Sequence, residues 1–353
     1  MMMQPFVFLD EQATASLLTM QEVVETCEAV LLDQGSERAL LSQPAAMFLA
    51  GDRDKPTQFK VKGGYLPGLD SCGFRVVGDV GVDGQFGECH YCLLLDPRTA
   101  KPRALVAQTE LHRMRTAACG LVALRHLAST ATLTVALIGA GKIGTYFAAG
   151  FHDVFPDRKL MIASRRIESA IALADRVRVA SRRVEAASVQ DAIASAEAVV
   201  TLTNSSEPVI AADVLRPGMT IVGMGEHHEL PAGLLRRADR FIVDDFGFAS
   251  VLGSLSVWLA RGDVERAGAA ARVDATLGAI VAKRATGRRS DTDKILAIVQ
   301  GLAIADLGLT EMCRRRAIAA QGLTLSAPVP QDVERDMHAE EMHAEDIHAE
   351  GTH

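Results

Sequence analysis

The spacing of hydrophobic positions divides the chain near residue 129. Upstream, residues 11–32 carry apolar side chains at helical spacing and predict one amphipathic helix. From residue 73 to 108 the pattern is that of strands, with FRVVGDV, HYCLLL and RALVA, the last two joined by the turn DPRTAKP. The stretch TELHRMRTAACGLVALRHLA then returns to the helical period. This part of the chain therefore combines strands with helices.

After residue 129, short apolar runs alternate with helical stretches. The runs are TVALI, LMIAS, AVVTLT, TIVGM and RFIVD. Such alternation is typical of a doubly wound parallel sheet, and we expect helices from there to residue 322. The C-terminal stretch MHAEEMHAEDIHAEGTH is polar and repetitive, which predicts a disordered tail over 331–353. Its repeat places four histidines in register: His338, His343, His348 and His353.

Composition narrows the class of protein. A chain of 353 residues with 48% hydrophobic and 23% charged residues is long enough for two ordinary globular domains. The net charge of −7 argues against nucleic acid as a partner. No apolar run reaches the ~18 residues of a membrane span, and six cysteines form no disulfide framework, so we expect a cytoplasmic protein. Cys89 and Cys92 form a CxxC, but its strand-like surroundings do not favour a metal site.

A glycine-rich turn follows the first of these runs. The stretch TVALIGAGKIGTYFAAGF reads as a strand, a turn with Gly139, Gly141 and Gly144 in GxGxxG spacing, and a helix opened by Lys142 and Ile143. In this context the glycines permit a tight turn, close approach of a pyrophosphate and close packing of helix on sheet. The free N–H groups of the helix N-terminus would then face the phosphates. The motif predicts a nicotinamide dinucleotide.

The end of the next predicted strand bears on the choice of cofactor. An NAD site usually carries an acidic residue there that binds the ribose 2′-hydroxyl. LMIASRRIESA instead presents Ser164, Arg165 and Arg166. Two guanidinium groups and a hydroxyl suit a 2′-phosphate, which favours NADP(H) and leaves NAD(H) open.

Several segments in order carry a family resemblance: HRMRTAACGLVALRHLA, LIGAGKIG, TLTNSSEPVI and QGLAIADLGLTEMCRRRA. Over residues 10–325 the sequence resembles the ornithine cyclodeaminase/mu-crystallin family, with RTAA as the most specific element. The resemblance implies a Rossmann domain (129–304) inserted in a discontinuous α+β domain (1–128 with 305–330) that binds substrate and forms a homodimer. It also implies hydride exchange between nicotinamide and the carbon that bears an amino acid's nitrogen.

Family motifs transfer roles to particular positions. Arg115 of RTAA matches an arginine that clamps the substrate carboxylate, and a guanidinium can do so bidentately. Thr116 beside it, and Thr203 and Asn204 further on, match positions that line the cofactor crevice. The resemblance thus predicts one substrate contact and three cofactor contacts.

The family lysine has two candidates. QFKVKGGYL offers Lys60 and Lys62, which lie two apart and so on the same face of a strand. We favour Lys62, because the following glycines would let a substrate approach, and keep Lys60 as the alternative. The sequence departs from the family at SQPAAMFLA, where a second carboxylate-binding arginine is usual and alanines stand. Arg53 in the next loop is a candidate substitute.

The loop GMGEHHEL is a second departure. Family members carry a catalytic aspartate after this strand, followed by Glu-Leu, whereas this chain keeps Glu229 and Leu230 but has no aspartate. The loop should lie at the carboxyl edge of the sheet, where ligands of doubly wound folds bind. Glu226 is our candidate for the aspartate's role. His227 is the alternative, because imidazole suits acid–base catalysis near neutral pH.

Three functions are compatible with these residues. The first is an NAD(P)-dependent oxidoreductase acting on the C–N bond of an amino or imino acid. The paired aspartates of ADRFIVDDFGFA favour, within it, a resemblance to siderophore-precursor dehydrogenases. The second is a cyclodeaminase that releases ammonia, and the third a non-catalytic NADP(H)-binding protein of the crystallin kind. Net consumption of cofactor separates the first from the second.

Overall fold

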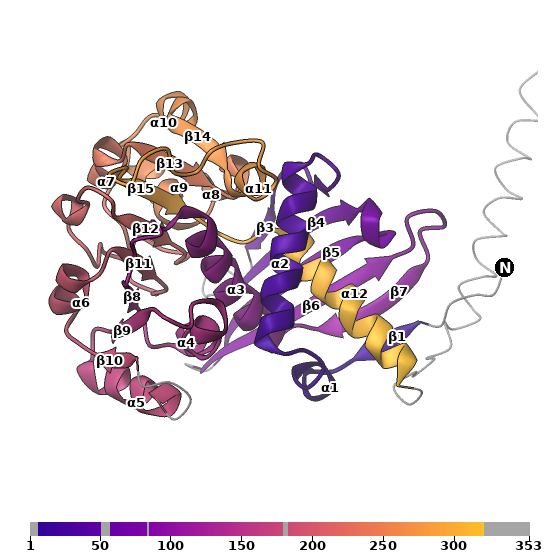
Figure 1. Cartoon of the computed structure of the whole chain (residues 1–353). Helices are drawn as coiled ribbons and strands as arrows, with labels where there is room; N and C mark the ends of the chain where they lie inside the picture. The colour runs from indigo at the N-terminus through magenta and orange to yellow at the C-terminus, as the bar shows by residue number, and fades with distance from the viewer. Residues whose placement is uncertain (1–5, 51–56, 83–84, 179–182, 321–353) are drawn as a thin grey trace, which may run out of the picture.

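The computed structural model describes residues 6–50, 57–82, 85–178 and 183–320, and its elements form two units, each built on one sheet (Figure 1). Sheet A is mostly antiparallel, and only its edge strand β1 pairs in parallel with β7. Its strands in spatial order are β1 (Val7–Leu9), β7 (Pro102–Ala107), β6 (Gln85–Leu95), β5 (Ser71–Val82), β4 (Thr57–Leu66) and β2 (Leu40–Leu41), with β3 (Met47–Ala50) also on β4.

Helices from both ends of the chain pack on sheet A or beside it. They are α1 (Glu11–Ala15), α2 (Met20–Gly35), α3 (Thr109–Leu127) and α12 (Ala303–Ala319), with a short 3-10 helix η1 (Pro67–Leu69) between β4 and β5. The helix α12 contacts β4, β5 and β6, so the chain returns to the first unit after completing the second. The apolar residues of α2, α3 and α12 form a core with those of sheet A.

The prediction of one helix over residues 11–32 is wrong. The structure has two helices there: α1 ends at Ala15 with Ser16 as its C-cap, and Thr19 caps the start of α2. The Thr19 backbone N–H and hydroxyl both donate to the Glu22 carboxylate, and the Glu22 N–H donates back to the hydroxyl, a capping box that fixes the start of α2. The helical spacing of apolar residues continues across the break between α1 and α2, so the sequence pattern did not reveal the break.

Sheet B is parallel throughout its described strands and confirms the expected doubly wound fold. All five predicted runs are strands. In spatial order the sheet is β10 (Val184–Ala186), β9 (Lys159–Ala163), β8 (Thr134–Ile138), β11 (Ala198–Thr201), β12 (Thr220–Gly223), β15 (Ile295–Ile298), β13 (Arg240–Val243) and β14 (Val273–Thr276).

The expectation of helices alone up to residue 322 is wrong, because β14 and β15 lie in that region. The strand β15 is inserted between β12 and β13 and is fully buried. A four-residue apolar run such as ILAI cannot be assigned to a strand by its period alone. The helices of this unit are α4 (Lys142–Val154), α5 (Ile167–Arg178), α6 (Val189–Ser195), η2 (Ala212–Val214), α7 (Gly233–Arg237), α8 (Phe246–Ala249), α9 (Gly253–Arg261), α10 (Arg266–Arg272) and α11 (Leu277–Val281).

The helix α3 joins the two units. It contacts α2 and β6 on one side and α4 and β12 on the other, and most of its side chains are buried. Small residues allow this close packing: a Cβ on Gly120 would lie 2.6 Å from the sulfur of Met224. The helix therefore fixes the two sheets relative to each other and sets the width of the space between them.

Two other expectations concern membrane-spanning helices and metal sites. In the part of the chain that the structure describes, no helix is long and apolar enough to cross a membrane. Within the same residues no group of three His, Cys, Asp or Glu side chains could hold a metal ion, and Cys89 and Cys92 are free on β6. The predicted histidine-repeat tail and Arg53 lie outside the described residues.

Candidate functional site

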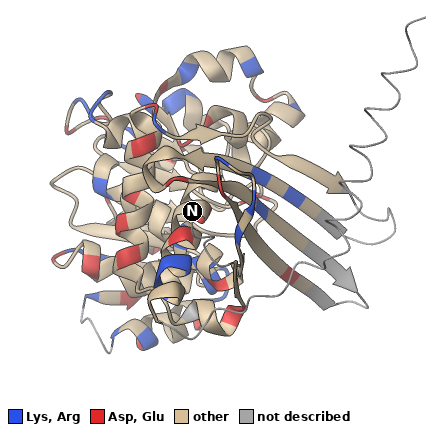
Figure 2. Ribbon diagram, turned by 90° about the vertical axis from the view of Figure 1, so that its right-hand side faces the viewer, with Lys and Arg blue, Asp and Glu red and all other residues tan. Residues whose placement is uncertain are grey.

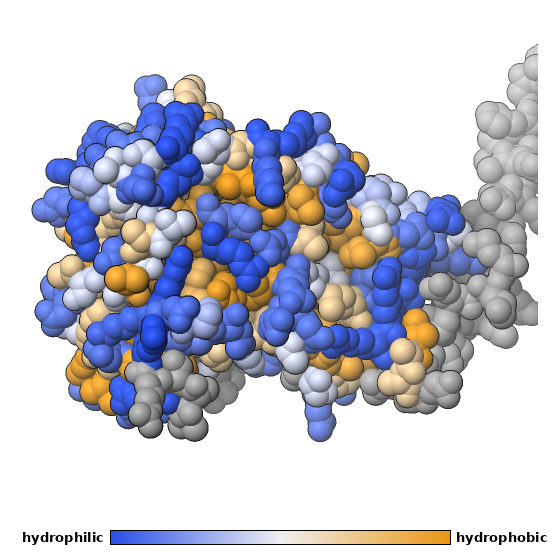
Figure 3. Space-filling view, viewed as in Figure 1, coloured by the Kyte–Doolittle hydropathy of each residue, from blue (hydrophilic) through white to orange (hydrophobic). Residues whose placement is uncertain are grey.

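A cleft of about 1660 Å³ lies where the carboxyl ends of six strands of sheet B face sheet A and α3. The strands are β10, β9, β8, β11, β12 and β15, and the order along the chain reverses between β8 and β11, the usual place for a ligand in such sheets. On the face seen in Figure 3, apolar residues gather in the middle, between the two units, with hydrophilic residues around them. The cleft thus has a dinucleotide-type wall and a wall built by the other unit.

The glycine turn is shaped as the fingerprint requires. Gly139 has φ +132°, and a Cβ there would lie 2.2 Å from the carbonyl oxygen of Leu202. A Cβ on Gly144 would lie 2.0 Å from the carbonyl oxygen of Gly139, so close packing excludes any side chain. At Gly141, by contrast, a Cβ would meet nothing within 4 Å. That open space fits the close approach of a diphosphate.

The helix α4 begins directly after this turn and points its N-terminus at the cleft. No side chain caps it, and the N–H groups of its first turn, starting at Lys142 and Ile143, are left for a ligand. The aligned peptide dipoles favour negative charge there. The predicted cofactor residues of this segment therefore lie together in a geometry that fits a dinucleotide.

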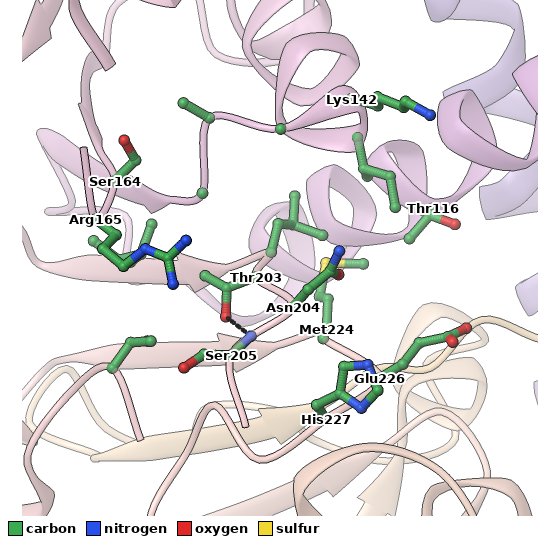
Figure 4. A pocket seen from close by; sticks show the side chains of 18 of the residues that line it. Thr116, Lys142, Ser164, Arg165, Thr203, Asn204, Ser205, Met224, Glu226 and His227 are labelled. Carbon is green, nitrogen blue, oxygen red and sulfur yellow. Dashed lines mark hydrogen bonds between the residues drawn. The ribbon is translucent and has the colours of Figure 1, made fainter. Parts of the chain in front are cut away.

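The predicted 2′-phosphate residues line the same cleft at the end of β9. Arg165 and Arg166 are exposed, and the Ser164 hydroxyl donates to the backbone carbonyl of Arg166. In Figure 4 the Arg165 guanidinium extends toward Thr203, which follows β11, two strands away in the sheet. The carboxylate of Glu168, in the first turn of the following helix, also lines this end of the cleft.

Glu229 organises the opposite edge of the cofactor wall. Its side chain is fully buried, and its carboxylate accepts five hydrogen bonds. The hydroxyl of Thr201 (2.6 Å), the N–H and hydroxyl of Thr203 (3.0 and 2.9 Å), and the N–H groups of Met224 (2.9 Å) and Gly225 (2.6 Å) all donate to it. One side chain therefore holds the ends of β11 and β12 together.

The ionisable loop after β12 reaches the cleft at both of its predicted positions. Glu226 and His227 line the cleft below Asn204 in Figure 4, whereas His228 is buried away from it. The Nζ atom of Lys60 lies 3.0 Å from the Glu226 Oε1 atom. Burial alone would raise the pKa of Glu226, but the neighbouring Lys60 ammonium lowers it to about 2, so this group is a carboxylate.

A buried ionic cluster lies behind the inner end of the cleft. Asp306 of α12 accepts a hydrogen bond from Arg115 Nε (2.8 Å), and its other oxygen lies 3.3 Å from Lys62 Nζ. Burial would raise the pKa of Asp306, but Arg115, Arg75 and Lys62 together hold it below its usual value. Burial also holds the pKa of Lys62 well below its usual range, against the opposing effect of Asp306.

The two predicted lysines and the predicted arginine thus differ in position. Lys60 lines the cleft, whereas Lys62 and Arg115 are each only 2% exposed and lie behind its surface. Thr116, one residue after Arg115, does line the cleft. The roles given to Arg115 and Lys62 stay predictions. In the structure, other residues lie between these two side chains and a ligand in the open cleft.

Several residues that line the cleft were not predicted as part of a site. They include Arg75, His90, His112 and Gln300. Arg75 and His90 come from neighbouring strands, and Figure 2 shows the basic positions that sheet A carries on its strands. In each of the segments FRVVGD and HYCL, side chains alternate between the two faces of a strand. This alternation does not show the register of the two strands, which brings Arg75 close to His90. Asp306 lies in the segment QGLAIADLGLTEMCRRRA, which carries the family resemblance, but no role of its own follows for it from the sequence.

Fold and site together define a class: a two-unit, dinucleotide-binding protein whose cofactor cradle shares one cleft with a basic patch on an adjoining sheet. Within that class, the chain belongs to the ornithine cyclodeaminase/mu-crystallin family, whose model matches residues 7–321. The predicted family is therefore confirmed over the whole described fold.

Relatives with assigned reactions include reductases of imino acids. The chain is 27% identical to a Δ1-pyrroline-2-carboxylate reductase of Bacillus cereus over 86% of this chain and 94% of the relative. It is 24% identical to iminosuccinate reductase of Paracoccus denitrificans, over 88% and 98%. Among solved structures, Δ1-pyrroline-2-carboxylate reductase of Thermococcus litoralis, in complex with NADH and L-proline, superposes with a TM-score of 0.78 at 21% identity, over 89% and 98%.

Proposed function

We propose that the protein is an NAD(P)-dependent oxidoreductase that acts on the C–N bond of an amino or imino acid. The observation that carries this proposal is that one cleft joins the dinucleotide cradle to a carboxylate–lysine pair and buried basic residues. In the reductive direction the reaction is imino acid + NAD(P)H + H⁺ → amino acid + NAD(P)⁺. When bound, the nicotinamide supplies the hydride, and the chain must bind the substrate carboxylate and hold a proton at the nitrogen.

The residues of the cleft divide these tasks. Basic side chains at its inner end attract the substrate carboxylate, which orients the C–N bond toward the cofactor wall. Glu226, as a carboxylate, holds the protonated nitrogen and stabilises its positive charge. His227 beside it exchanges the proton with solvent through its imidazole. Lys60, bound to Glu226, keeps that carboxylate ionised and in place.

The cofactor that we propose is NADP(H) in preference to NAD(H). Support comes from Arg165 and Arg166, which are exposed at the cleft and can each reach a 2′-phosphate, and from the hydroxyl of Ser164. Glu168 lines the same end of the cleft, and a carboxylate near the ribose would favour NAD(H). The structure of the Thermococcus litoralis relative contains NADH, so the preference has to be measured.

We also propose a homodimer, with residues 1–128 and 305–330 supplying both the substrate wall and the interface. The outer face of sheet A carries exposed apolar side chains that sit in register across β4 and β5, where Phe59 pairs with Gly78, Val61 with Val76, and Gly63 with Phe74. Exposed apolar patches of this kind mark association surfaces. The archaeal alanine dehydrogenase to which this chain is similar is a dimer. Light scattering on the purified protein tests this.

A cofactor-consumption assay tests the function. Purified protein is mixed with Δ1-pyrroline-2-carboxylate or another imino acid and NADPH or NADH, and loss of the reduced nicotinamide absorbance is followed. The matched control is Gly141→Val, which the open space at Gly141 lets fold but which obstructs the diphosphate. Turnover by the wild type and none by the control supports the proposal.

Three results would contradict it in different ways. Release of ammonia from ornithine without net change in cofactor would show a cyclodeaminase, the activity in the family's name. Tight binding of NADPH with no turnover of any amino or imino acid would show a non-catalytic binding protein. Binding of neither cofactor would contradict all three functions.

A further inference from the structure

One carboxylate beside the glycine turn lies between two basic side chains. It belongs to Glu88 of β6, whose Oε2 atom lies 2.8 Å from Nη2 of Arg113 on α3 and 3.8 Å from Nζ of Lys142, the first residue of α4. All three side chains line the cleft. One oxygen atom therefore connects sheet A to two helices at the place where the cofactor cradle begins.

The two basic side chains lie beside the expected position of the diphosphate. Lys142 directly follows Gly141, and among the described residues no atom would lie within 4 Å of a Cβ there and no side chain caps the helix. Arg113 precedes Thr116 by three positions and therefore shares its face of α3, and Figure 4 shows Thr116 and Lys142 on the same side of the cleft. Phosphate oxygens at the glycine turn would thus have an ammonium and a guanidinium close by.

The charges of this group are balanced by the protein itself. Nη1 of Arg113 also pairs with Glu110, whose other oxygen accepts a hydrogen bond from the Tyr146 hydroxyl on α4 at 2.7 Å. Burial would lower the pKa of Arg113, but its hydrogen bond to Glu88 and the charge of Glu110 raise it, so the guanidinium is ionised. Two cations and two carboxylates thus share this corner of the cleft, and a diphosphate beside them would be repelled by Glu88.

The carboxylate that can move is Glu88. Glu110 is held by Arg113 on one side and by Tyr146 on the other. The Glu88 side chain is 34% exposed, and its distance of 3.8 Å from the Lys142 ammonium is long for an ion pair. It can turn into water, and Arg113 then keeps Glu110 and gains a phosphate oxygen, so no partly buried charge loses its partner.

We propose that Arg113 and Lys142 bind the diphosphate of the dinucleotide and that Glu88 competes with it for these two side chains. This assignment rests on the proposed function, which supplies the ligand. A guanidinium and an ammonium bind phosphate oxygens through charge-assisted hydrogen bonds, and these bonds come in addition to those from the N–H groups of α4. Glu88 therefore lowers the affinity for the dinucleotide without contacting it.

The test measures the affinity for the cofactor without any substrate. The whole chain is titrated with NADPH and, separately, with NADH, and the fluorescence of the bound nicotinamide is followed. Glu88→Gln should bind both cofactors about three- to tenfold more tightly, because a competing charge is lost. Lys142→Gln and Arg113→Gln should bind both about tenfold more weakly, since both cofactors carry the diphosphate. The affinity of these two variants should also fall less steeply with added salt than that of the wild type.

The matched control is Arg125→Gln. Arg125 lies on the same helix as Arg113 and pairs with Glu28 of α2 outside the cleft, so its loss should leave both affinities within about twofold of the wild type. Circular dichroism shows whether each variant is folded, and Lys142, whose side chain is 68% exposed, provides the test even if Arg113→Gln does not fold. The proposal is overturned if Lys142→Gln binds both cofactors as tightly as the wild type, if Glu88→Gln binds neither more tightly, or if Arg125→Gln weakens binding as much as Arg113→Gln.

Failure of the proposed function is distinguishable from these outcomes. The expected affinities without turnover of any amino or imino acid would overturn the function alone. Turnover with unchanged affinities would overturn only the assignment of Glu88, Arg113 and Lys142. A wild type that binds neither cofactor would overturn both.

Discussion

Replacing Glu229 by glutamine tests whether one carboxylate organises the cofactor wall. The amide would place its oxygen toward Thr201, Met224 and Gly225 and its NH₂ toward Thr203, whose N–H would then lose its acceptor. A stranded buried donor costs about 1–3 kcal/mol, and changing three charge-assisted bonds to neutral ones adds about 1 kcal/mol. We therefore expect a loss of about 2–4 kcal/mol, within the roughly 5–15 kcal/mol that keeps typical proteins folded.

Thermal unfolding followed by circular dichroism measures this loss. The midpoint of Glu229→Gln should fall by at least about 4 °C, since about 1 kcal/mol shifts a unit of this size by about 2–4 °C. NADPH affinity should fall as well, because Thr203 and Met224 line the cleft. The control is Glu207→Gln in the same region, whose side chain is 75% exposed and should change the midpoint by less than about 1 °C. Equal midpoints for Glu229→Gln and wild type would refute the five-bond account.

Three further predictions concern charge. Glu226→Gln should lower kcat about 100-fold or more, measured by steady-state kinetics, and leave the NADPH affinity unchanged, measured by fluorescence titration. An unaltered kcat would show that Glu226 has no part in the mechanism. Arg165→Gln should weaken NADPH binding about tenfold and NADH binding much less, and equal losses would contradict a 2′-phosphate contact. Burial raises the pKa of Asp244 to about 6 from its usual 3.8, so the folded state binds the extra proton and is stabilised as the pH falls through 6. Between about pH 7.5 and about pH 5, wild type should gain about 1 kcal/mol relative to Asp244→Asn in urea unfolding, and parallel profiles would exclude this.

The parts of the site that sequence predicts are those that depend on local structure. Gly139, Gly141 and Gly144 are close in the chain, and their role follows from one strand, one turn and one helix. Glu226 could be placed at the cleft because the loop follows a parallel strand, and such loops share one edge of the sheet. These inferences need the order of elements and no knowledge of how distant segments pair.

The remaining parts depend on register and on packing between distant segments. Arg75 meets His90 only because β5 and β6 pair with Val77 opposite His90, a register that alternation alone leaves undetermined. Arg115 and Asp306 are separated by 191 positions, and a sequence pattern shows neither their contact nor that it turns Arg115 away from the open cleft. The burial of a side chain is likewise not determined by the local sequence, since QFKVKGGYL places two lysines on one face without showing which of them reaches a ligand.

The contacts between the two units are unequal in strength, and this bears on how a substrate enters. Away from the cleft, α2 and α11 meet at Gly35 and Gly278 so closely that a Cβ on Gly35 would lie 1.9 Å from the Gly278 carbonyl oxygen. At the cleft, the units are bridged by Lys60 and Glu226, an ion pair whose carboxylate is half exposed and whose ammonium is buried. The exposed side of the Glu226 carboxylate can therefore take a substrate nitrogen while Lys60 stays paired with it, which leaves no buried charge without a partner. Because the other contact is close-packed, a substrate can bind in this way while the distance between the two walls stays fixed.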